Sequence, residues 1–122
     1  MVKSRNAKRS RQSAVDDDGG VVGELRDGRV SEPRRVWWVQ AEAMVGFFNA
    51  WQLGGDDRFL RASANSWAFI RAHHVDPERG EWRWYSALDV DTPETGLAGP
   101  WKAPYHNGRA LLELLRRLEA QR

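Results

Sequence analysis

Among the side chains of this chain that are suited to moving protons, two stand in unusual surroundings. His106 lies in the stretch GPWKAPYHNGRA (99–110), directly before a leucine-rich segment, and Glu42 lies in the apolar stretch VWWVQAEAMVGFFNAW (36–51). An imidazole can both accept and donate a proton near neutral pH, so it suits general acid–base work. A carboxylate among apolar residues must be paired, hydrogen-bonded or hydrated. Both residues are therefore candidates for a functional site.

The same residues also allow purely structural roles. Glu42 could interact favourably with the N-terminus of its own helix. His106 could be satisfied by the local backbone at a helix start, and Trp37 and Trp38 could be core residues. The residue types alone leave both explanations open.

Two short strands and a first helix are predicted in the first half of the chain. Short apolar runs flank Asp27-Gly28, a dipeptide suited to a tight turn, which predicts a small hairpin within residues 16–30. The next stretch predicts a helix over 36–53 that ends at two glycines. This helix is apolar around nearly its whole circumference, so we expect it to be buried on most sides.

The second half of the chain is less uniformly apolar. A helix over 57–74 carries one apolar stripe, with Asp56 or Asp57 as its N-cap, and a final helix over 107–120 is amphipathic through its leucines. Between these helices, an alternating run predicts a strand. Its apolar face is formed by Trp82, Trp84, Leu88 and Val90. The pattern predicts an all-α fold with layers of inner and outer helices and short β-hairpin insertions.

Composition restricts the class of protein. With 122 residues and 41% apolar content, the chain is expected to form a single globular domain. It contains no cysteine, which excludes disulfides, a thiolate nucleophile and cysteine-bound zinc, and which fits a cytoplasmic protein. No stretch has the apolar length of a membrane span, so no membrane partner is expected.

The basic character of the chain is confined to its beginning. Residues 1–12 hold five Lys and Arg and no acid, whereas the rest of the chain carries more acidic than basic side chains. A basic arm can bind phosphates, but the composition favours a disordered basic tail over 1–15, followed by one domain over 16–122. The net charge of +2 is therefore no sign of nucleic-acid binding, and no nucleic-acid partner is expected.

Three stretches carry a resemblance to a known family. They are VWWVQAEAMVGFFNAW (36–51), GEWRWY (80–85) and GPWKAPYHNGRALLELLRRL (99–118). In this order and spacing they closely resemble the C-terminal part of the N-acylglucosamine 2-epimerase family, particularly its cellobiose (mannobiose) 2-epimerase and mannose isomerase branch. The resemblance implies an (α/α)6 barrel of twelve helices, of which this chain would supply the last three, in the order inner, outer, inner.

The resemblance also implies roles for individual residues. The histidine of the family's PYHN motif is a general acid/base, and it corresponds to His106. The tryptophans of the motifs resemble sugar-contacting aromatics, Glu42 resembles the pocket carboxylate, and Arg109 is expected to have an orienting role. The implied substrate-binding residues are Trp37, Trp38, Glu42, Trp101 and Arg109.

The implied reaction is epimerisation of a reducing sugar at C2 or aldose–ketose isomerisation, both of which pass through an enediolate. Epimerisation removes the C2 proton and returns a proton to the opposite face, which requires two bases but neither a metal nor a cofactor. His106 would be one base. His73, His74 and Asn107 are expected to be structural, so the second base is missing from this chain.

We therefore expect a C-terminal fragment of an epimerase that is inactive alone. Its partners would be a mono- or disaccharide and the missing N-terminal helices of the same protein. Two other functions remain open. A glycoside hydrolase on an (α/α)6 scaffold would need two carboxylates around the scissile bond, of which only Glu42 is a candidate. A non-catalytic carbohydrate-binding module would use the tryptophans without needing His106.

Overall fold

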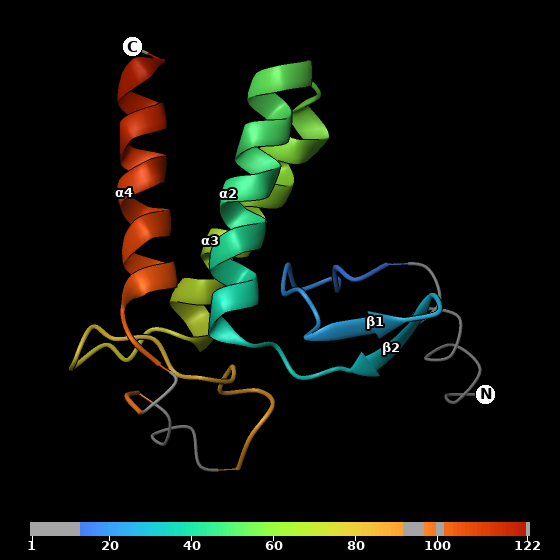
Figure 1. The fold of residues 1–122 in the computed structure, drawn as a ribbon, viewed down its shortest axis with the longest axis vertical. Coiled ribbons are helices and arrows are strands. Elements are labelled where there is room, and N and C mark those ends of the chain that lie inside the picture. Colours follow the sequence, from blue (N-terminus) through green and yellow to red (C-terminus); the bar gives the residue numbers. More distant parts are fainter. Residues whose placement is uncertain (1–12, 92–96, 100–101, 122) are drawn as a thin grey trace.

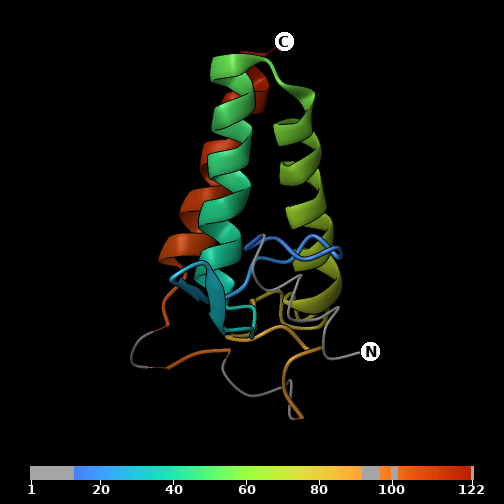
Figure 2. The same ribbon diagram turned by 90° about the vertical axis from the view of Figure 1, so that its right-hand side faces the viewer.

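A computed structural model describes residues 13–91, 97–99 and 102–121 of the chain. These residues form a hairpin and three helices: β1 (Glu24–Arg26), β2 (Arg29–Glu32), α2 (Trp37–Gly54), α3 (Asp57–His73) and α4 (Tyr105–Ala120). The helices lie side by side, with α2 between α3 and α4 (Figures 1 and 2). α2 and α4 run in the same direction, and both begin at the end of the bundle where the hairpin and the loop after α3 lie. The predicted helices and hairpin are confirmed.

The hairpin turns where the sequence predicted. Asp27 and Gly28 both have positive φ angles, 53° and 72°, and a turn of this kind matches the twist of the flanking strands. The antiparallel pairing places Leu25 opposite Val30. The hairpin is small and lies to one side of the helices (Figure 1).

Local signals also set the junction between α2 and α3. Gly55 follows α2 with a φ of 72°, and its backbone N–H donates to the carbonyl oxygen of Trp51, as expected for a left-handed C-terminal cap. Asp56 then caps α3, because its side chain accepts a hydrogen bond from the backbone N–H of Arg58. The two helices therefore reverse direction over a short connection.

The core lies between the three helices and the loop after α3. Its buried members are Trp37, Ala41, Met44, Val45, Ile70, Trp82 and Ala110. Residues from α2, α3, α4 and the loop all take part, so the loop is packed into the fold instead of being an appendage.

The prediction that the helix over 36–53 is buried on most sides is wrong. α2 buries one stripe of side chains between Trp37 and Phe48, while Trp38 and Leu53 are 43% and 82% exposed. The physical reason is that α2 packs mainly against α3 and α4. The other sides of α2 are half-buried or exposed in the described part of the chain.

The prediction of a strand over residues 82–90 is also wrong. This segment is an irregular loop that makes isolated bridges, one of which joins Val36 to Tyr85. Among the described residues the only sheet is the β1–β2 hairpin, so the segment has no strand to pair with. Its alternating apolar residues have different environments, since Trp82 is buried in the core and Leu88 is exposed.

Polar contacts fix the loop that precedes the hairpin. The guanidinium of Arg35 donates hydrogen bonds to Asp18 and Asp89, and this loop is thereby joined to the loop after α3. The side-chain amide of Gln40 donates to the carbonyl oxygen of Val21 and accepts from its N–H, at 2.7 and 2.8 Å. Both anchors belong to the start of α2 or the residues just before it.

The predicted tail over 1–15 lies mostly outside the described residues. Of this stretch the structure describes 13–15, where Val15 forms a bridge with Val21 and the carbonyl of Ala14 accepts a hydrogen bond from Val22. These three residues therefore belong with the folded part of the chain.

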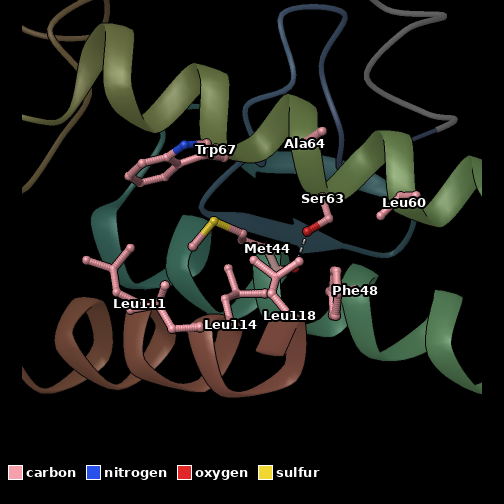
Figure 3. Close-up of a pocket in the computed structure, with 10 residues that line it drawn as sticks. Met44, Phe48, Leu60, Ser63, Ala64, Trp67, Leu111, Leu114 and Leu118 are labelled. Carbon is pink, nitrogen blue, oxygen red and sulfur yellow. Dashed lines mark hydrogen bonds between the residues drawn. The ribbon is translucent and has the colours of Figure 1, made fainter. Parts of the chain in front are cut away.

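An apolar groove of about 360 Å³ runs between the three helices, beside the second half of α4 (Figure 3). Its lining includes Met44 and Phe48 of α2, Leu60 and Trp67 of α3, and Leu114 and Leu118 of α4. Ser63 also lines the groove, but its hydroxyl donates to the carbonyl oxygen of Met44. The groove surface is thus almost entirely apolar.

Candidate active site

The starts of α2 and α4 bring an imidazole, a carboxylate and a guanidinium together. Nδ1 of His106 lies 3.0 Å from Oε1 of Glu42, and Nη2 of Arg109 donates to both carboxylate oxygens of Glu42. Residues three apart share one face of a helix, so His106 and Arg109 both reach α2 from the first turns of α4. The structure thus gathers three of the predicted site residues, although 64 positions separate Glu42 from His106.

The contacts keep Glu42 ionised. The hydrogen bond from Arg109 lowers the pKa of Glu42, burial opposes it, and the hydrogen bond with His106 lowers the pKa further. The same contact raises the pKa of Arg109. Because an ionised carboxylate only accepts hydrogen bonds, neutral His106 must bond it as the Nδ1–H tautomer. Nε2 then carries the free lone pair, and no described residue is bonded to it.

Aromatic rings form a hollow next to His106. The ring of Trp37 packs on that of Trp84 with centroids 4.4 Å apart, and the Trp38 ring centroid lies 5.9 Å from that of His106. These four rings line an open hollow of about 440 Å³. Trp37 is buried while Trp38 is exposed, so Trp37 supports the hollow and Trp38 offers a face to solvent.

Trp84 is the residue of this hollow that the sequence analysis did not propose. The predicted strand placed it on one face with Trp82, but the loop turns Trp82 into the core and Trp84 toward His106. The carbonyl of Trp84 accepts a hydrogen bond from the N–H of Trp37. The sequence signal that could have identified Trp84 as a site residue is its place in the GEWRWY motif. Trp101, the remaining predicted site residue, lies outside the described residues.

The other histidines do not line the hollow. His74 is buried, with Nδ1 2.9 Å from the carbonyl oxygen of Arg83, and burial lowers the pKa of His74 to about 4. The ring of His73 packs on Phe69 with centroids 4.9 Å apart. Both contacts hold the end of α3 in place.

Among the described residues, no group of three or more His, Cys, Asp or Glu side chains could hold a metal ion. None of the helices in the described ranges has the length and apolar character needed to cross a membrane. The groups described at the site are an imidazole, a carboxylate and a guanidinium beside aromatic rings.

A comparison with protein families assigns the chain. The profile of the N-acylglucosamine 2-epimerase (GlcNAc 2-epimerase) family matches residues 5–110. The chain belongs to this family. The match begins within the predicted tail over 1–15 and reaches into α4, so it includes Glu42, His106 and Arg109. The resemblance carried by the three motifs is confirmed.

Individual proteins are similar to most of the chain. A cellobiose 2-epimerase of Ruminococcus albus is 44% identical over 103 residues, which are 82% of this chain and 26% of that protein. The structure of a cellobiose 2-epimerase from Bacillus thermoamylovorans is similar with a TM-score of 0.73 and 41% identity, over 84% of this chain and 26% of that chain. A D-mannose isomerase structure matches with a TM-score of 0.74, over 89% of this chain and 28% of that chain, and at 22% identity it supports the fold alone.

These structures are of the (α/α)6 barrel type, so the predicted fold class is confirmed. The chain spans about a quarter of the length of the epimerases that it matches.

Proposed function

We propose that this chain forms one wall of the active site of a sugar 2-epimerase or aldose–ketose isomerase. The observation that carries the proposal is the hydrogen-bonded cluster of His106, Glu42 and Arg109 beside a hollow of aromatic rings. Membership of the GlcNAc 2-epimerase family supports the reaction class. The similarity to cellobiose 2-epimerases supports a reducing sugar as the substrate.

In this proposal His106 is a general acid/base. Once the sugar ring has opened, Nε2 takes the proton from C2, and the electron pair of the broken C–H bond enters the enediolate. Epimerisation is completed when a second acid donates a proton to the opposite face of C2. Isomerisation is completed when C1 receives the proton instead and the hydroxyl proton of O2 moves to O1, which leaves the carbonyl group at C2. General acid–base help of this kind is worth about 10²–10⁴ in rate.

The neighbours of His106 prepare it for this task. The carboxylate of Glu42 accepts the Nδ1–H, which fixes the tautomer and stabilises the imidazolium that forms when Nε2 gains a proton. Arg109 keeps Glu42 ionised and in place. The exposed ring of Trp38 holds the apolar face of the sugar, together with Trp84 and, by resemblance, Trp101, while the buried ring of Trp37 supports them.

The second base comes from a further part of the epimerase domain. In the described part of the chain no second imidazole lines the hollow, and the chain spans about a quarter of the epimerases that it matches. We propose that further helices of the same domain complete the site and pack into the groove between α2, α3 and α4. The apolar lining of the groove supports this occupant.

The electrostatics disfavour Glu42 as the general acid of a glycoside hydrolase. Such an enzyme requires a carboxylic acid whose pKa is raised so that it can protonate the leaving group, whereas the pKa of Glu42 is lowered. A non-catalytic sugar-binding module would use the aromatic hollow alone. If the chain were such a module, changes in the hollow would weaken sugar binding alone. His106→Ala would then leave the turnover of an assembled enzyme unchanged.

The test uses a hybrid enzyme, in which residues 13–122 replace the matching part of the Ruminococcus albus cellobiose 2-epimerase. We expect the hybrid to epimerise cellobiose and to exchange the C2 proton with deuterated water. His106→Ala should lower both rates by about 10²–10⁴, while His73→Ala should leave them nearly unchanged. A folded His106→Ala hybrid with the rates of the unaltered hybrid would refute the proposed role.

A further inference from the structure

A second carboxylate, that of Glu81, lies on the buried side of the start of α4. Its Oε1 accepts three hydrogen bonds, from the backbone N–H of Trp82 at 2.7 Å, Nδ2 of Asn107 at 2.6 Å and Nζ of Lys102 at 3.2 Å. Burial alone would raise the pKa of Glu81, but these donors outweigh burial and lower that pKa. The carboxylate is therefore charged at neutral pH, and it joins the loop after α3 to the first turn of α4.

The start of α4 has few anchors of its own. Its N-cap, Pro104, makes no side-chain capping hydrogen bond, and no acidic residue lies in the first turn. Helix N-termini carry unpaired N–H groups and are stabilised by nearby negative charge. Glu81 supplies a carboxylate from outside the helix, and it does so through Asn107, the residue that follows His106.

Lys102 extends this contact to the aromatic hollow. Its side chain is only 1% exposed, and besides Glu81 its Nζ bonds the carbonyl oxygen of Leu97 at 3.0 Å. The same Nζ lies 5.4 Å from the ring centroid of Trp37. Since a buried ammonium needs a charged partner, the position of Lys102 beside Trp37 depends on Glu81.

We infer that Glu81 is a positioning residue, which holds His106 where its Nδ1 meets Glu42. It acts through Asn107 in the first turn of α4 and through Lys102 beside the aromatic hollow. The importance of this positioning for catalysis rests on the proposed function of His106. The geometry itself can be measured without turnover.

The first test measures the tautomer of each imidazole by ¹⁵N NMR on the chain at a mildly alkaline pH. We expect His106 to be the Nδ1–H tautomer in the unaltered chain and a mixture of both tautomers in Glu81→Gln. The chain has three histidines, and His74, which contacts the same loop at Arg83, should keep its spectrum. Glu78→Gln, at an exposed position of that loop, should change no ring.

A second variant guards against a failure of Glu81→Gln to fold. Asn107→Ser removes the amide that Glu81 holds but leaves the ion pair of Glu81 with Lys102, and it should release His106 in the same way. The inference is wrong if His106 keeps one tautomer in a folded variant. It is equally wrong if the His74 spectrum changes as much as that of His106, because Glu81 would then only stabilise the fold.

The hybrid enzyme separates this inference from the proposed function. There Glu81→Gln should lower kcat about tenfold to a hundredfold and change KM by less than about twofold, because a misplaced acid/base group costs rate more than binding. An altered His106 tautomer with an unaltered kcat would contradict the proposed role of His106, and with it the catalytic value of its position. An unaltered tautomer would contradict the role of Glu81 whatever the rate.

Discussion

The two ends of the helix bundle differ in how far their side chains are already paired with partners in this chain. At the helix starts, charged groups are paired within the described residues, Glu42 with Arg109 and Glu81 with Lys102. Beside the second half of α4, the groove is apolar and open (Figure 3). Leu115 belongs to its lining and is 57% exposed. The geometry of the candidate site therefore depends on contacts inside this chain, whereas the cover of the groove is assigned by our proposal to further helices of the domain.

We call the end with the helix starts the paired end and the end with the groove the open end. The largest expected effect concerns turnover at the paired end. A polypeptide of these 122 residues alone should catalyse no measurable C2 exchange, because the described site offers one imidazole on one face and an open hollow. Closed, water-excluding pockets are what make such groups effective. The measurement is deuterium incorporation at C2 of cellobiose, mannose and N-acetylglucosamine in deuterated water.

The hybrid enzyme under the same conditions is the control for this experiment. Rapid exchange by the polypeptide alone would mean that the paired end is a complete catalyst. Covering the open end would then not be needed for activity.

The next effect concerns the stability of the paired end. Ile70 is fully buried in the core between α2 and α3, so Ile70→Ala should lower the free energy of unfolding by about 2–5 kcal/mol. Leu53→Ala, at a position that is 82% exposed, should cost less than about 0.5 kcal/mol. Urea denaturation of both variants measures the difference. Similar costs would mean that the core is not packed as described.

The paired end should also be the acid-sensitive end. The pKa of His74 falls from 6.5 to about 4 on folding, because the ring is buried. Below pH 6.5 the unfolded chain binds a proton that the folded chain does not, so stability falls as the pH falls, until the folded ring is protonated near pH 4. The loss amounts to roughly 3 kcal/mol.

Replacing the ring tests this assignment. His74→Asn should remove most of the stability change between pH 6.5 and pH 4, and His73→Asn should preserve it. The measurement is the free energy of unfolding in urea as a function of pH. An unchanged pH slope in His74→Asn would assign the acid sensitivity to other groups.

The features that could be predicted from the sequence are those that neighbouring residues decide. The turn at Asp27-Gly28, the end of α2 at Gly55 and the cap of α3 at Asp56 each depend on residues close together in the chain. Periodicity located all three helices to within two residues at each end. The assignment of His106 and Glu42 to one site came from the family resemblance and not from periodicity.

The features that could not be predicted depend on distant partners. Nothing local shows that Glu81 will meet Asn107, 26 residues away, or that Trp84 will pack on Trp37. The apolar circumference of α2 predicted burial, but burial is decided by which neighbours are present. The strand over 82–90 failed for the same reason, since an alternating pattern becomes a strand only beside another strand.

The smallest expected effect tests the open end directly. Leu115→Ala in this chain should lower the free energy of unfolding by less than about 1 kcal/mol, because a side chain that is 57% exposed loses little buried area. In the hybrid, where the proposed helices cover the groove, the same change should cost about 2–5 kcal/mol. Leu25→Ala on the hairpin, outside the groove, should cost the same in both proteins. Urea denaturation gives all four values. An equally small cost of Leu115→Ala in both would mean that the groove stays uncovered in the longer enzyme, and an equally large cost would mean that the chain already covers it by itself.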